Sequence, residues 1–237
     1  MSIEIKEADA PFVEKIKNDN ISFNFIKEVE NQLQEHISKD KLTEIIDGLH
    51  LQMVWVWLAI DSLDAIKTID KVKIKRAQNF MYITHSSLIY RYSMELAKLF
   101  DQKDGLSIYQ IRNICLQNPG YFDASFDIVE YCKNFKKSLS QYKPLINNIT
   151  ERRRKTYAHN DKDYYLFSQK AIDDFPLDMQ EIEDMANLIY TFAKTMQEKI
   201  GSKRAHLGYP SNSDDVKRLF GEKTDADIWL EDNEDCF

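Results

Sequence analysis

Apolar residues recur at intervals of three and four along most of the chain, which is the period of an α-helix with one buried face. The clearest examples are residues 78–100, 125–142 and 178–200, while 51–66 is apolar on most sides, so that Trp55 is expected in the core. Alternating strand patterns are nearly absent, and the 237 residues include only 6 Gly and 5 Pro. The pattern therefore predicts an all-α protein, an antiparallel helical bundle with long helices and few connections.

Local signals indicate where several of these helices begin and end. Asp178, followed three residues later by Glu181, predicts a capping box at the start of the last long helix. Gly201 suits the left-handed residue that follows a helix. Pro144 predicts a kink after the 125–142 helix, because proline lacks the backbone donor and crowds the preceding turn. Near the amino terminus the period predicts a helix over residues 26–37, then a break.

Charge is distributed unevenly along the chain, whose net charge is −7. Residues 211–237 hold nine acidic and three basic residues, and residues 133–162 hold nine basic and two acidic ones. The sustained helical period ends at residue 201, so we expect a helical domain over 1–201 and an acidic appendage over 202–237, with one short helix around 214–220. The opposite charges suggest that the appendage covers the basic segment, in which case its removal raises RNA affinity at low salt.

Few sequence signals point to a membrane, a metal or a cofactor. The three cysteines are far apart and form no CxxC pair, which favours a reducing compartment. No signal-peptide pattern opens the chain, and the most apolar run, residues 51–60, is half the roughly 20 residues of a membrane span. The five histidines are scattered, and no glycine-rich phosphate loop is present. We expect a cytoplasmic protein with no membrane contact, no metal and no cofactor.

The segment 152–161, with the sequence RRRKTYAHND, carries the remaining candidate chemistry. Three consecutive arginines point in three directions around a helix, so they do not form one solvated stripe. Arginine binds phosphate oxygens with a charged fork, and histidine exchanges protons near neutral pH because its ordinary pKa is about 6.5. The simpler interpretation of His159 is a helix-terminal histidine that interacts with the last carbonyls.

The spacing of Arg154 and His159 resembles the R-x(4–6)-H motif of the HEPN superfamily. The surrounding segment and the earlier pattern Leu96–Asp101 (LAKLFD) are similar to the abortive-infection AbiU-like branch. This resemblance implies a metal-independent ribonuclease of a phage-defence or toxin–antitoxin system, with His159 as acid and base and Arg154 as phosphate stabiliser. It implies a homodimer, with RNA and an antitoxin protein as further candidate partners. The candidate phosphate contacts are Arg152, Arg153, Lys155 and Asn160.

Two features leave alternatives open. Many active members of the superfamily have a small polar residue after the arginine, where this chain has Lys155. On an ideal α-helix, Arg154 and His159 lie about 140° apart, so the helix unwinds at 158–160 or two copies build the site. The chain is therefore a ribonuclease, an inactive HEPN-like RNA- or nucleotide-binding regulator, or a dimeric helical interaction protein.

Overall fold

The computed structural model describes residues 37–101, 106–157, 168–205, 211–224 and 227. The chain divides into two compact units, 1–41 and 42–237. Of the first unit only 37–41 are described, where the Ser38 hydroxyl accepts a hydrogen bond from the Lys41 amide (3.2 Å). The helix expected over residues 26–37 lies outside the described residues, apart from its last position.

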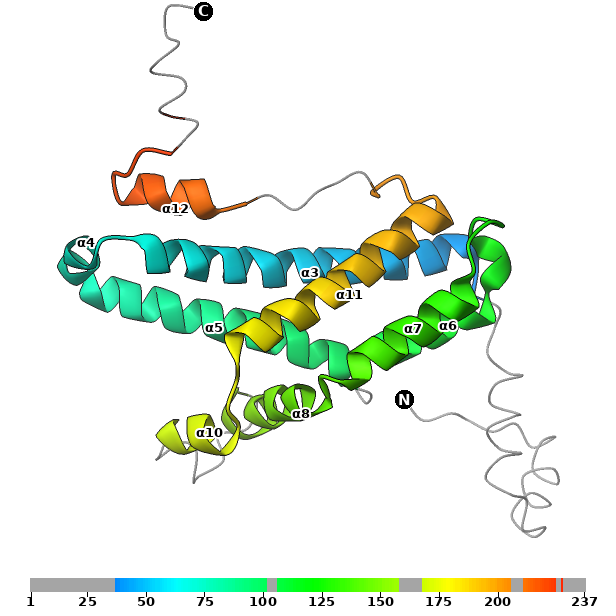
Figure 1. The fold of residues 1–237 in the computed structure, drawn as a ribbon, viewed down its shortest axis with the longest axis horizontal. Helices are drawn as coiled ribbons and strands as arrows, with labels where there is room; N and C mark the ends of the chain where they lie inside the picture. Colours follow the sequence, from blue (N-terminus) through cyan, green and yellow to red (C-terminus); the bar gives the residue numbers. More distant parts are fainter. Residues whose placement is uncertain (1–36, 102–105, 158–167, 206–210, 225–226, 228–237) are drawn as a thin grey trace, which may run out of the picture. The chain divides into compact units, whose positions relative to one another are not determined.

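All secondary structure in the described part of the chain is helical, which confirms the predicted all-α class. The longest helix is α3, and it runs antiparallel beside α5, to which the short helix α4 connects it (Figure 1). The two long helices are tied together by the Gln52 side chain, which donates to the Glu95 carbonyl at 2.8 Å. The elements are α3 (Lys39–Thr68), α4 (Lys71–Arg76), α5 (Gln78–Phe100), α6 (Ile108–Gln117), η2 (Pro119–Tyr121), α7 (Ile128–Ser140), α8 (Lys143–Arg152), η3 (Arg153–Tyr157), α10 (Ser168–Asp174), α11 (Met179–Ile200) and α12 (Ser213–Leu219).

The core forms where the predicted apolar stripes meet. α7 packs against α11, and its Phe135 ring stacks on Phe192 with the ring centroids 4.0 Å apart. Every member of the expected α11 stripe is at most 2% exposed. The stripe consists of Ile182, Met185, Ile189, Phe192, Met196 and Ile200. Burial of these side chains fixes which face of α11 points inward, since each one contributes about 1.5–3 kcal/mol when removed from water.

The predicted ends of α11 are observed in large part. Asp178 caps the helix by accepting a hydrogen bond from the Glu181 amide (3.0 Å). The return bond from the Glu181 side chain is not among the contacts of the described residues, so the box is half formed. Gly201 adopts the left-handed conformation with φ of 78°, as expected. Pro144 occupies the first turn of α8, which confirms a break between α7 and α8.

Helix α3 differs from its prediction in two ways. It runs over 30 residues from Lys39 to Thr68 and so extends beyond the predicted 51–66 helix at both ends. Trp55 was expected in the core but is 47% exposed, and the Arg91 guanidinium lies 5.1 Å from the centre of its ring. A membrane-spanning helix would have a similar length and composition, but half of the most apolar window of α3 is buried inside the protein. α3 is therefore a core helix with one edge open to solvent.

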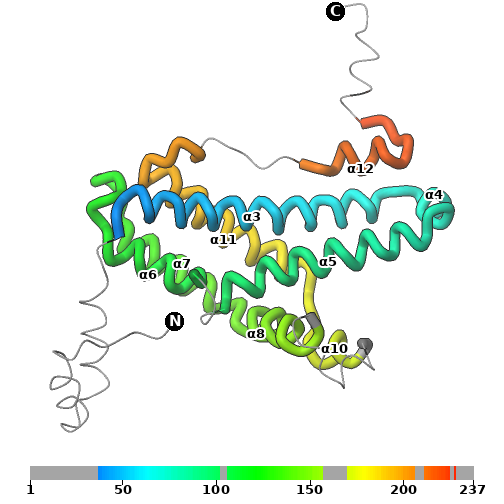
Figure 2. Tube along the Cα trace, turned by 180° about the vertical axis from the view of Figure 1, so that it is seen from behind, coloured from blue at the N-terminus to red at the C-terminus, as the bar shows by residue number. Residues whose placement is uncertain are grey.

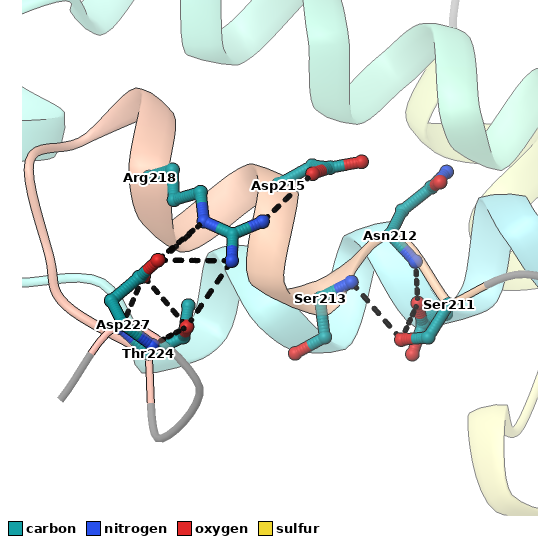
Figure 3. Close-up of polar contacts among 8 residues, drawn as sticks. Ser211, Asn212, Ser213, Asp215, Arg218, Thr224 and Asp227 are labelled. Carbon is teal, nitrogen blue, oxygen red and sulfur yellow. Dashed lines mark hydrogen bonds and ion pairs between the residues drawn. The ribbon is translucent and has the colours of Figure 1, made fainter. Parts of the chain in front are cut away.

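The described part of the acidic appendage lies along α3. The Asp61 carboxylate on α3 accepts hydrogen bonds from the Asn212 amide (2.6 Å) and the Ser211 hydroxyl (2.9 Å). Figure 3 shows both ends of this segment: Ser211 and Asn212 at its start, and further on Asp227, whose carboxylate accepts from Arg218 and Thr224. The expected short helix is observed as α12. The predicted division into a 1–201 domain and a 202–237 appendage stays a prediction.

Candidate functional site

The basic segment lies on a helix that changes its hydrogen-bonding pattern. α8 ends at Arg152, and the next five residues, Arg153–Tyr157, form the π-helical turn η3. A π turn joins residue i to residue i+5 instead of i+4, and such turns occur mostly as short interruptions of α-helices, frequently at functional sites. Side chains five positions apart therefore lie about one turn apart in a π-helix. The calculation of about 140° for such a pair assumes α-helical geometry, which does not apply to η3.

Neighbouring helices hold η3 in place. It packs against α5 and α10, and it continues directly from α8, which itself packs on α5 (Figure 2). The carboxyl end of α5, where the LAKLFD pattern ends, thus faces the basic segment. The two motifs that carried the family resemblance are adjacent in space although about fifty positions separate them in sequence.

The three consecutive arginines bond three different elements. Arg152 is 9% exposed, and its Nε donates to the Phe175 carbonyl beyond α10 at 2.6 Å. Arg153 forms an ion pair with Asp101, the residue that ends α5. The Arg154 side chain is 58% exposed, and its Nη2 lies 2.5 Å from a Glu151 carboxylate oxygen. The arginines therefore point in three directions, and Arg154 is the one most accessible to a ligand.

Two buried polar atoms of η3 have no hydrogen-bond partner within the described part of the chain. They are Nε of Arg153 and the hydroxyl oxygen of Thr156. A buried donor left without a partner costs about 1–3 kcal/mol, so proteins seldom keep one without a compensating role. Both atoms belong to the π turn. The Ser93 hydroxyl on the neighbouring α5 is also buried without a hydrogen-bond partner, so the π turn shares this feature with a helix that it packs against.

Of the other predicted site residues, some have described positions and some do not. Lys155 is half-buried and belongs to η3. His159 and Asn160 lie outside the described residues, so the predicted Arg154–His159 pair stays a prediction. The lysines Lys133, Lys136, Lys137 and Lys143 are exposed, as expected of a solvated helix face.

Sequence reasoning missed the two carboxylates that neutralise the arginines. The pairing of Glu151 with Arg154 could have been predicted, because residues three positions apart face each other on a helix. Asp101 carried no such signal, since its pairing with Arg153 joins distant parts of the sequence. Across the residues with described positions, no group of three or more His, Cys, Asp and Glu residues is arranged to hold a metal ion. The described part of the site therefore consists of cations and their carboxylate partners.

Comparison with known proteins gives one match. The family model HEPN_AbiU2, described as AbiU2, matches residues 39–219. The match begins at the start of α3 and ends at the last residue of α12, so it includes η3 and the described arginines. No curated protein matches the chain, and no solved structure does.

Proposed function

The chain belongs to the AbiU2 family of HEPN domains, and from that premise we propose that it is a metal-independent endoribonuclease of a bacterial phage-defence or toxin–antitoxin system. In this proposal His159 transfers protons and Arg154 stabilises the phosphate. The observation that carries it is the π turn at 153–157, at the position where the sequence puts the arginine of the motif. Arg154 lies on that turn, so the first part of the path from Arg154 towards His159 is not α-helical, and the angle of about 140° does not hold for it.

The proposed reaction needs only groups that this segment supplies. A base removes the proton from the ribose 2′-hydroxyl, and that oxygen attacks the adjacent phosphorus. The bond from phosphorus to the 5′-oxygen breaks, and an acid returns a proton to that oxygen. The products are a 2′,3′-cyclic phosphate and a 5′-hydroxyl. Histidine suits both proton transfers because its ordinary pKa is near neutral pH, and arginine remains charged throughout.

Glu151 determines what Arg154 must do when RNA binds. Its carboxylate shares the Arg154 guanidinium at 2.5 Å, where a phosphate would otherwise bind. The guanidinium has five hydrogen-bond donors, so Arg154 either bonds the Glu151 carboxylate and the phosphate together or exchanges Glu151 for the phosphate. An exposed ion pair of this type is worth less than about 1 kcal/mol, so the exchange is inexpensive.

The same ion pair supports a second candidate function. A guanidinium already held by a carboxylate, followed by Lys155 in place of a small polar residue, suits a member that binds RNA or a nucleotide without turnover. An antitoxin protein and a second copy of the chain remain proposed partners for either function.

Cleavage of RNA in the presence of EDTA separates the two functions. We expect the full chain to cleave total RNA, and we expect His159→Ala and Arg154→Ala to lose at least a hundredfold in rate. Matched controls are His85→Ala and Arg91→Ala, two exposed residues of α5, with Arg91 in an i,i+4 pair with Glu95. Binding without cleavage by the wild-type chain would support the regulator. Equal cleavage by all variants would overturn the assignment of the pair.

A further inference from the structure

A pocket of about 410 Å³ adjoins the candidate site on its α8 side. Two of its lining residues connect it to the arginines. Phe100 immediately precedes Asp101, the partner of Arg153, and Glu151 is itself the partner of Arg154. The pocket is lined by Phe100, Tyr109, Ile146, Asn147, Thr150 and Glu151.

The apolar side of the pocket is largely aromatic. Phe100 is 6% exposed and its ring is tilted by 49° against that of Tyr109, with the centroids 6.3 Å apart. Tyr109 is half-buried, and burial raises the pKa of its phenol above the ordinary value of 10.0. The phenol therefore stays neutral near pH 7 and offers a planar surface for stacking.

Three side chains on the polar side of the pocket can form hydrogen bonds: the uncharged Asn147 and Thr150, and the acidic Glu151. Asn147 is exposed, so its amide presents two donors and one acceptor oxygen to the pocket. The Thr150 hydroxyl donates to the Ile146 carbonyl at 2.6 Å, which leaves its oxygen lone pairs as acceptors. The Glu151 carboxylate accepts only. An anion would be repelled by Glu151, whereas a flat neutral group with N–H donors fits all three side chains.

We propose that this pocket binds one nucleobase of RNA, and that the phosphate next to that base is held by Arg154. The proposal rests on the function proposed above and names the substrate group that positions the scissile bond. The volume suits a nucleobase with its ribose. The base stacks on Tyr109, and its polar edge bonds Asn147 and Glu151. Adenine, cytosine and guanine carry an exocyclic amino group that donates to a carboxylate, so they bind better than uracil.

Binding of free ribonucleosides isolates the pocket from the arginines, because a nucleoside has no phosphate. Adenosine, cytidine, guanosine and uridine are titrated into the full chain by calorimetry or by NMR. We expect Tyr109→Ala to weaken the best of them about tenfold, since base–aromatic stacking has that magnitude. Tyr109→Phe keeps the ring and should bind like the wild type. Asn147→Ala should weaken the binding of all four nucleosides. Glu151→Ala should reduce the difference between uridine and the other nucleosides, because the carboxylate accepts from the exocyclic amino group.

The matched controls are Tyr90→Ala on α5 and Asn134→Ala on α7, which replace exposed residues outside the pocket. If Tyr109→Ala does not fold, the comparison of Asn147→Ala with the wild type decides. No nucleoside binding, or binding that neither Tyr109→Ala nor Asn147→Ala changes, would overturn the pocket assignment even if RNA is cleaved.

The same nucleosides are then added to the RNA cleavage assay. If nucleosides slow RNA cleavage by the wild type, and Tyr109→Ala abolishes both this inhibition and nucleoside binding, the occupant of the pocket is an RNA base. Nucleosides that bind without slowing cleavage would indicate a free nucleotide instead, and would overturn the proposed RNA subsite. If the chain does not cleave RNA, we measure instead whether the nucleosides displace bound RNA. In that case the proposed ribonuclease function fails, but the nucleobase pocket is still tested.

Discussion

Adjacent arginines in this protein have different energetic roles. The buried Arg152 bonds the Phe175 carbonyl, whereas Arg154 is mostly exposed and pairs with Glu151 one turn away. Arg152→Ala removes a charged donor and leaves the Phe175 carbonyl without it, which costs about 1.5–3 kcal/mol. Arg154→Ala should cost less than about 0.5 kcal/mol, because exposed helical ion pairs contribute little.

Thermal unfolding checks this contrast directly. Arg152→Ala should lower the melting temperature by several degrees, since each kcal/mol corresponds to roughly 2–4 °C in a chain of this size. Arg154→Ala should melt like the wild type while losing RNA cleavage. Equal melting temperatures for the two variants would contradict the structural role assigned to Arg152.

Two buried cysteines should be chemically inert in the folded protein. Burial raises the pKa of the Cys115 thiol to about 12, and the nearby Cys132 adds to the effect; burial raises the pKa of Cys132 to about 11. The reactive thiolate is thus scarce at pH 8. We expect iodoacetamide at pH 8 to leave both residues unmodified in native protein and to alkylate both in urea, as read by peptide mass spectrometry. Rapid native labelling of either one would contradict the described burial.

At the scale of the helices, the long amphipathic ones and the short α12 were predicted from sequence, whereas the short helices α4 and α10 were not. α5 and α11 were predicted because their apolar residues repeat over five or more turns with clear ends. α4 and α10 have six and seven residues, too few for a period to emerge, and α4 buries none of its side chains. Their positions depend on contacts with α5 and η3, which are not local in sequence.

The candidate site, like the helices, was predictable only in part. The arginines and their divergent directions followed from three consecutive positions on a helix. The π turn did not, because hydrogen bonding from i to i+5 leaves no distinctive residue pattern. The exposure of Trp55 was also missed, since an aromatic residue in an apolar run is usually buried. In each case the outcome was decided by packing between elements far apart in the sequence.

The attachment of the α12 segment to α3 depends on Asp61. Its carboxylate accepts from the Ser211 hydroxyl and the Asn212 amide, just before α12 begins. Asp61→Ala should therefore release residues 211–224 while the helical core stays folded. We expect faster hydrogen exchange in that segment and unchanged exchange in α11. Asp64→Ala on the same helix, which removes only an exposed pair with Lys67, is the matched control. Equal exchange in the two variants would show that Asp61 does not hold the segment.

At the scale of the whole molecule, the amino-terminal half of α5 offers a surface for the proposed second copy. Phe80, Tyr82 and Ile83 are 63–74% exposed there, and clustered exposed apolar side chains often mark an interface. Light scattering at micromolar concentration should give about twice the 27.9 kDa mass of the chain. Ile83→Asp should give a monomer, while Leu219→Asp, at an 82% exposed position on α12, should remain a dimer. A monomeric wild type would contradict the proposed homodimer.

The described part of the acidic appendage is bonded to elements other than η3, so we expect its charges to act on RNA binding through their long-range field. Asn212, just before α12, bonds α3, and Glu222 pairs with Lys73 of α4, whereas η3 packs against α5 and α10. Charges separated by more than a Debye length, about 8 Å at 0.15 M salt and about 30 Å at 0.01 M, are screened from each other. A charge effect without direct contact must therefore be confined to low salt.

Removal of residues 228–237 tests this without disturbing Asp61 or α12. The deletion takes away four carboxylates and no bases, which changes the net charge from −7 to −3. We expect RNA affinity to rise severalfold at about 0.01 M salt and to stay unchanged at about 0.15 M, because only the unscreened field differs. Replacing the same four acids by their amides should reproduce the change, since it alters charge and keeps length. An affinity gain that persists at 0.15 M salt would instead indicate that the deleted residues contact the RNA-binding surface directly, and no gain at low salt would exclude a role for their charge.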